Sequence, residues 1–121
     1  MSLKAVATGQ FNLVNEATGQ NFLSFDLSAI FGVLTGVQEQ VYQERNIIVG
    51  DGVVSLNAGG VANVKGLLLI VEGAGTVTVK HDSNTNGIEV SSCLLVFGKL
   101  SSITVETSAT QQIKVKYLLF E

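Results

Sequence analysis

The sequence predicts an all-β fold, an antiparallel β-sandwich of jelly-roll type with at most one short helix near residues 27–35. Three observations predict it. Short runs of alternating apolar and polar residues recur at hairpin spacing, Gly and Asn mark the turns between them, and proline, which central strands exclude, is absent. A chain of 121 residues is the size of one domain, residues 1–121, of which residues 1–36 form part of the sandwich, an arm or a crossover segment.

The first 36 residues carry a strand pattern followed by a helical one. Residues 4–15 and 22–25 have strand character, and residues 16–20 form a turn between them. A helix of two turns is then predicted, capped by Asp26 or Ser28 and ended by Gly36. It rests on apolar residues at i, i+3, i+4 and i+7, which are Leu27, Ile30, Phe31 and Leu34.

The middle of the chain predicts an edge strand and two turns. Residues 38–49 combine the densest charge of the chain with β-forming residues, as suits a sheet edge. Residues 50–52 form a turn, residues 53–56 a short strand and residues 57–60 a second turn. Residues 61–64 then lead into the rest of the sandwich.

A repeated pattern organises the remaining residues. The stretch 67–90, LLLIVEGAGTVTVKHDSNTNGIEV, aligns with the stretch 93–115, CLLVFGKLSSITVETSATQQIKV. Each copy reads as a hairpin followed by a third strand. The alternation within the copies predicts a core of ten residues, which are Leu68, Ile70, Val77, Val79, Leu95, Phe97, Ile103, Val105, Ile113 and Val115.

Charge is scarce, and this scarcity points to assembly. Asp, Glu, Lys and Arg make up 14% of the residues, against about 25% in an ordinary soluble domain. A protein with so few charges commonly has part of its surface covered by a partner. The net charge of −3 and the scattered basic residues argue against nucleic-acid binding, and no apolar stretch is long enough for a membrane span.

One loop matches half of a calcium-binding motif. Residues 82–87, DSNTNG, place Asp82, Asn84 and Asn86 at the spacing of a calcium loop. The twelfth position is Cys93, where such a loop needs a bidentate Glu, and Asp, Asn and Gly are also what a polar turn requires. The stretch is therefore read as a turn, with a weak calcium site as the alternative and no other cofactor.

The residue inventory argues against an enzyme. His81 is the single histidine and falls near a strand end, where a structural role is common. Cys93 opens an apolar run and is predicted to be a small core residue, and one cysteine cannot form an internal disulfide. We expect no catalytic residues.

Carbohydrate binding is a further possibility for a jelly roll. Sugar sites use exposed aromatic rings, and the sequence contains no Trp and two Tyr. Tyr117 alternates with Ile113 and Val115 and is predicted to be buried, which leaves Tyr42, on the predicted edge strand, as the candidate platform.

Residues 41–121 resemble the small jelly-roll virion proteins of tailed bacteriophages. The resemblance rests on a proline-free, charge-poor chain with alternating strands such as GTVTVKH and SSITVET and a terminal KVKYLLF. It implies a structural virion protein without catalysis, made in the host cytoplasm and built into the particle. Capsid decoration (cement) proteins of this kind bind the major capsid protein and bridge capsomers. The alternatives are a tail or baseplate subunit and a receptor- or glycan-binding module.

Two apolar segments are the predicted contacts with partners. We expect a homo-oligomer, in keeping with the trimers that the resemblance implies, because homomeric interfaces tolerate apolar surface. The predicted interface residues come from the helical segment and from the C-terminal strand, and they are Leu27, Ile30, Phe31, Leu34, Leu118 and Phe120.

Overall fold

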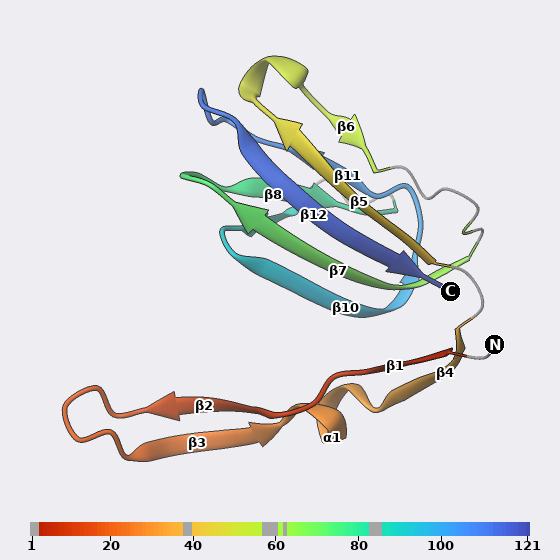
Figure 1. Ribbon diagram of the computed structural model, residues 1–121. Coiled ribbons are helices and arrows are strands. Elements are labelled where there is room, and N and C mark those ends of the chain that lie inside the picture. Colours follow the sequence, from red (N-terminus) through yellow and green to blue (C-terminus); the bar gives the residue numbers. More distant parts are fainter. Residues whose placement is uncertain (1–2, 38–39, 57–60, 62, 83–85) are drawn as a thin grey trace. The chain divides into compact units, whose positions relative to one another are not determined.

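The protein consists of antiparallel strands in two units. A computed structural model describes residues 3–37, 40–56, 61, 63–82 and 86–121. It divides the chain into an N-terminal unit, Met1–Gln38, and a C-terminal unit, Glu39–Glu121. Within the described ranges there is one α-helix, α1 (Leu27–Phe31), beside a single turn of 3-10 helix, η1 (Val49–Asp51) (Figure 1). The prediction of an all-β protein with at most one short helix is confirmed.

The C-terminal unit is a sandwich of two four-stranded sheets (Figure 1). The first sheet has the strand order β10-β7-β12-β5, and the second has the order β6-β11-β8-β9. In chain order the strands are β5 (Gln40–Ile47), β6 (Val54–Ser55), β7 (Val64–Glu72), β8 (Val77–Lys80), β9 (Ile88–Val90), β10 (Cys93–Leu100), β11 (Thr104–Glu106) and β12 (Ile113–Phe120).

The pairing of these eight strands is that of a jelly roll. The first strand pairs with the last, β5 with β12, and the pairs β6–β11, β7–β10 and β8–β9 nest inside it. All are antiparallel, so the unit resembles one long hairpin folded over on itself, and the pairs β12–β7 and β11–β8 join the folded halves into two sheets. The predicted jelly-roll fold is confirmed, and β5 is the predicted edge strand.

The core lies between the two sheets. Six of the ten predicted core residues are buried there, which are Val77, Val79, Ile103, Val105, Ile113 and Val115. Tyr117, also predicted to be buried, is 1% exposed, and its hydroxyl donates a hydrogen bond to Gln43 Oε1 at 2.6 Å. The alternation of apolar with Thr, Lys or Glu residues in β8, β11 and the first half of β12 therefore identified the correct face.

The prediction for β7 and β10 was wrong by one residue. In β7, Leu67, Leu69 and Val71 are buried, whereas Leu68 is half-buried and Ile70 is 36% exposed. Leu94 and Val96 of β10 pack against the core, so the predicted Leu95 and Phe97 face the opposite side. Both strands contain a continuous apolar run, residues 67–71 in β7 and 93–97 in β10. In such a run an alternation of buried and exposed residues fits either register equally well.

The sequence predicted that the first two strands of each copy of the repeat pair as a hairpin, and this prediction was wrong. Strands β7 and β8 lie in different sheets, as do β10 and β11. Instead the first strands of the two copies pair with each other, β7 with β10, and so do the second strands, β8 with β11. The alternation in the repeat reports which residues face the core, and it carries no information on which strands pair.

The N-terminal unit is a two-stranded ribbon in two sections. Strand β1 (Leu3–Val6) pairs with β4 (Val33–Val37), and β2 (Gln10–Val14) pairs with β3 (Asn21–Asp26). The turn between β2 and β3 is held by Asn15, whose backbone N–H donates to Gln20 O at 2.7 Å and whose side-chain oxygen accepts from Ala17 N at 2.9 Å. This agrees with the turn predicted for residues 16–20.

The helix is shorter than the sequence had predicted. Asp26 caps its start, because its carboxylate accepts from the backbone N–H of Ser28 at 3.0 Å. The helix ends at Gly32, which adopts φ 68°, rather than at Gly36. Gly tolerates this left-handed conformation at low cost, and the β-branched residue Val33 then begins a strand.

Candidate functional site

The outward side of the sheet β10-β7-β12-β5 is the first candidate binding surface, called here the outer face. Its residues are those that alternate with the core residues, and the strand registers place them in rows across the sheet. From one end to the other the rows are Phe97–Gly66–Phe120–Gln40, Leu95–Leu68–Leu118–Tyr42, Cys93–Ile70–Lys116–Glu44 and Glu72–Lys114–Asn46.

The first two rows, called here the apolar rows, contain no charged residue. The rings of Phe97 and Phe120 meet edge to face with centroids 5.7 Å apart, on either side of Gly66. In the second row Leu68, Leu95 and Leu118 are half-buried, and Tyr42 is 58% exposed. The rows are apolar on β10, β7 and β12 and end on β5 with Gln40 and Tyr42. A continuous apolar area across three strands is typical of an interface.

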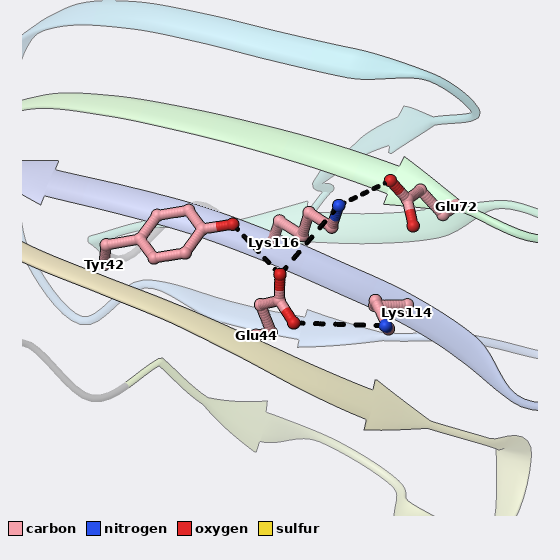
Figure 2. A network of polar contacts seen from close by, with 5 residues as sticks. All are labelled: Tyr42, Glu44, Glu72, Lys114 and Lys116. Carbon is pink, nitrogen blue, oxygen red and sulfur yellow. Dashed lines mark hydrogen bonds and ion pairs between the residues drawn. The ribbon is translucent and has the colours of Figure 1, made fainter.

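The last two rows carry a balanced network of charges (Figure 2). Lys116 Nζ lies 2.8 Å from Glu72 Oε1 and 3.9 Å from Glu44 Oε1, and Lys114 Nζ lies 3.9 Å from Glu44 Oε2. The Tyr42 hydroxyl donates to Glu44 Oε1 at 3.2 Å, so the network reaches the apolar rows. Two lysines and two glutamates give this end of the outer face no net charge.

The close contact between Lys116 and Glu72 changes the pKa of both side chains. The hydrogen bond from Lys116 holds the pKa of the Glu72 carboxyl below its usual value. The same hydrogen bond, with the charge of Glu72, raises the pKa of Lys116. Both side chains are therefore ionised at neutral pH, and no proton-transfer role follows from these shifts.

The β2–β3 hairpin carries the second candidate surface. Phe11 pairs with Phe25 and Leu13 pairs with Leu23, so these four side chains share one side of the hairpin, called here the hairpin face. Their exposed fractions are between 43% and 53%. The opposite side is polar at the same level, because Asn12 pairs with Ser24 and accepts a hydrogen bond from its hydroxyl at 2.7 Å.

The predicted interface residues lie in both units. Leu118 is half-buried in the apolar rows, and Phe120 is 5% exposed beside Phe97. In α1, Leu27 and Phe31 are half-buried and Ile30 is 57% exposed. Leu34 lies in β4, and its side chain is outside the described part of the structure.

Sequence reasoning missed the hairpin face. The sequence does contain a pattern that indicates this face. On the two sides of a turn, apolar residues alternate with polar ones, and the apolar residues are Phe11, Leu13, Leu23 and Phe25. Such alternation is the pattern of a half-buried strand, and it left the segment as part of the sandwich, an arm or a crossover segment without identifying an exposed apolar face. The structure places these residues on a two-stranded ribbon, and their side chains are exposed there.

Hydrogen bonds join Asp82 to both His81 and Ser101. His81 Nδ1 lies 2.6 Å from Asp82 Oδ2, the Ser101 hydroxyl donates to Asp82 Oδ1, and the Asp82 N–H donates to Ser101 O at 2.6 Å. The carboxylate stands between the imidazole and the hydroxyl, so His81 cannot take the serine proton as in a hydrolase triad. These hydrogen bonds, that from Ser101 first, lower the pKa of Asp82.

The structure describes part of the loop that carries the partial calcium motif. Both carboxylate oxygens of Asp82 already have partners, and Asn84 lies outside the described residues. Asn86 is exposed. Among the residues that the structure describes, no three His, Cys, Asp or Glu side chains gather in a group that could hold a metal ion.

The prediction that Cys93 is a core residue was wrong. Its side chain is exposed, at the start of edge strand β10 and on the outer face opposite Ile70. The physical reason is again the apolar run, which left the register of β10 open.

Three hollows in the C-terminal unit are candidate ligand sites. Their volumes are about 220, 270 and 370 Å³, at or below the lower end of the range for ligand pockets. The largest is lined by Thr76, Thr78, Glu89, Glu106 and neighbouring residues, and Glu106 is paired with Lys80 at 3.1 Å.

Comparison of the sequence with protein-family models and with curated proteins found no match. In the described ranges there is also no helix with the length and hydrophobicity needed to cross a membrane. Function is therefore inferred from the two sheet surfaces themselves.

Proposed function

We propose that this protein is a structural component of a tailed-bacteriophage virion, a decoration protein that stabilises the capsid by binding across capsomer boundaries. It acts without catalysis and assembles as a homo-oligomer, most simply a trimer. The observation that carries the proposal is the presence of two apolar sheet surfaces, the apolar rows and the hairpin face, in a chain with 14% charged residues. Such surfaces are suited to permanent contacts with other subunits.

The stabilising effect needs no reactive group. A subunit that binds the assembled shell, and does not bind its separate parts, shifts the equilibrium toward the shell by mass action. The jelly-roll unit and the two-stranded ribbon each offer a sheet surface for that purpose. The fold is also the one that the resemblance to phage virion proteins implies, and this agreement supports the proposal.

Quantitative mass spectrometry of purified particles tests the proposal. A decoration protein is expected at a copy number comparable with that of the capsomers, and its deletion should lower the temperature at which heads release DNA. A few copies per particle would identify a tail or baseplate subunit instead. Absence from purified particles would reject the virion proposal.

A glycan-binding module is the second candidate, and one observation favours it. Tyr42 is 58% exposed on edge strand β5, and its hydroxyl contacts the carboxylate of Glu44 (Figure 2). An exposed ring beside a carboxylate can stack on a sugar and bind its hydroxyl groups. Tyr42→Ala should then abolish binding on a glycan array, whereas Tyr117→Phe should preserve it because Tyr117 is buried.

A further inference from the structure

The two edges of the sheet β10-β7-β12-β5 differ in composition. Edge strand β5 carries Glu44 and Arg45 among Gln and Asn residues, and charged side chains keep a sheet edge from pairing with another strand. Edge strand β10 begins with an uncharged apolar run, residues 93–97, and its charged residue, Lys99, follows only after the regular pairing with β7 ends. Residues 93–97 therefore lack the charge that protects the opposite edge.

Main-chain groups of β10 also point away from the sheet. The Val71 N–H donates to Ser92 O at 2.8 Å, one step before the pair Cys93–Ile70. Because main-chain bonds alternate along an antiparallel pair, Cys93 and Leu95 direct their N–H and C=O groups to the open edge. Among the described strands, β10 pairs with β7 alone. This edge thus offers hydrogen-bond donors and acceptors to a further strand.

The hydrophobic core is incompletely covered along the same edge. A two-residue connection joins β9 to β10, so these edge strands lie on one side of the sandwich. Leu94 and Val96 pack against the core but stay partly exposed, and Ile88, on the core side of β9, is 41% exposed. At the opposite edge, Ile47 of β5 and Val54 of β6 are buried. A strand added beside β10 would complete the cover of the core.

A strand that fits this edge must be apolar on both sides, because one side continues the apolar rows and the other meets the core. Among the other described strands with a free edge, β2 and β3 alternate apolar residues with Asn or Ser, β1 and β4 are interrupted by Lys4 and Thr35, and β5 is charged. β6 and β9 have only two and three residues. The apolar run that the edge requires is found in β10 itself, so the matching occupant is β10 of a second copy.

We propose that β10 of one copy pairs antiparallel with β10 of a second copy, so that their sheets join into one. A two-fold axis at Leu95 places Leu95 opposite its own copy and Leu94 opposite Val96 of the second copy. Leu95 then forms a hydrogen-bonded pair, as its outward main-chain groups require. The two neighbouring registers would bring Ser92 or Gly98 opposite an apolar side chain.

The pairing closes after two copies. The joined sheet ends in a β5 strand on each side, and the charges of β5 prevent further growth. The inference goes beyond the proposed function, because a two-fold contact is separate from the contact that forms a trimer. Experiments on the purified protein decide it whether or not the protein is found in virions, so the two proposals can fail independently.

Disulfide formation in Leu95→Cys/Cys93→Ser protein tests the contact. Opposed residues in a hydrogen-bonded antiparallel pair have Cα atoms about 5.5 Å apart, which suits a disulfide, so we expect covalent dimers under mild oxidation. Leu68→Cys/Cys93→Ser is the matched control, because Leu68 is also half-buried and lies in the same row, one strand further from the edge. Its two copies would be about 14 Å apart, and the yield of dimer should be at least several-fold lower.

The cross-linking result can contradict the proposal in two ways. The absence of dimers through position 95 would overturn it. A yield through position 68 that equals or exceeds the yield through position 95 would show contact between two outer faces, or random collision, and would also overturn it.

Hydrogen exchange distinguishes a second copy from the N-terminal unit of the same chain. The Leu95 amide, followed by NMR, should exchange more slowly as the protein concentration rises, whereas the Leu94 amide, bonded to β7, should be protected at all concentrations. Protection of Leu95 that does not depend on concentration would show that the chain covers its own edge and would overturn the proposal. The absence of protection at every concentration would do the same.

A charge placed at the axis should separate the copies. Leu95→Lys sets two like charges opposite each other, so it should halve the mass of the assembly in light scattering, and Leu68→Lys should leave the mass unchanged. An unchanged mass in Leu95→Lys protein, or an equal loss in both variants, would count against pairing at this edge.

Discussion

Gly66 lies directly beneath the ring of Phe120, so closely that a Cβ atom at position 66 would overlap the ring. The backbone of Gly66 does not have a positive φ, and the requirement for glycine here is one of space. The missing side chain leaves room for the end of the Phe120 ring over β7, where the ring reaches Phe97 on β10 at a centroid distance of 5.7 Å. The first of the apolar rows is built on this contact.

Gly66→Ala should therefore destabilise the protein. The ring of Phe120 would have to leave its place, and we expect the free energy of unfolding to fall by about 1–3 kcal/mol, as for other overpacked sites. Urea denaturation measures the change. Gly98→Ala is the control, because a Cβ there meets no atom within 4 Å, and it should be close to neutral. The same substitution is also made in Phe120→Ala protein, where the ring is absent. If Gly66→Ala changes the free energy of unfolding equally little in both proteins, the contact between Gly66 and Phe120 does not stabilise the fold.

Leu69→Ala and Leu68→Ala test the register of β7. Leu69 is fully buried in the core and Leu68 is half-buried on the outer face. Loss of a buried leucine leaves a cavity, so Leu69→Ala should lower the free energy of unfolding by about 2–5 kcal/mol. Leu68→Ala should cost clearly less in the same thermal or urea experiment. The reverse order would show that the register assigned to β7 is wrong.

Tyr117→Phe removes the hydroxyl that donates to Gln43 Oε1 at 2.6 Å. The loss leaves the amide oxygen of Gln43 without that donor inside the sandwich, and we expect a destabilisation of about 0.5–1.5 kcal/mol. Tyr42→Phe serves for comparison, because the Tyr42 hydroxyl contacts Glu44 on an exposed edge, where water can replace it. If the two substitutions lower the midpoint of urea unfolding equally, the burial assigned to Tyr117 and the exposure assigned to Tyr42 are contradicted.

The Lys116–Glu72 pair should make stability depend on pH in acid. Because Lys116 lowers the pKa of Glu72, the pair stabilises the folded state fully above the ordinary glutamate pKa of about 4.3. That stabilisation is lost as the pH falls through the lowered pKa of the folded state. In Lys116→Gln, NMR titration should show the pKa of Glu72 rising toward its usual value.

The same prediction has an unfolding test. The difference in melting temperature between native protein and Lys116→Gln should shrink as the pH is lowered below the ordinary glutamate pKa. Lys114→Gln should change the pKa of Glu72 less, because Lys114 acts on it only through charge at longer range. A constant difference across this pH range would exclude the ion pair as its source.

The amino-acid sequence by itself determined the fold class and much of the core. Strict alternation at Val77 and Val79, Ile103 and Val105, and Ile113, Val115 and Tyr117 identified the buried side of β8, β11 and the first half of β12. These strands are polar on one side, so a shift of one residue would expose the whole apolar set. Turn chemistry at residues 16–20 and the cap at Asp26 are equally local, and both were predictable.

Tertiary structure decided the register of the apolar runs, the pairing of the strands and the two candidate surfaces. Leu67–Leu68–Leu69–Ile70 has no polar side to orient it, and packing against the second sheet selects Leu67 and Leu69 for the core. The pairs β7–β10 and β5–β12 join residues far apart in the chain, on which alternation within a strand carries no information. The register and the pairing also determine the outer face and the hairpin face. They decide which side chains are buried, and only the side chains that stay exposed can bind a partner.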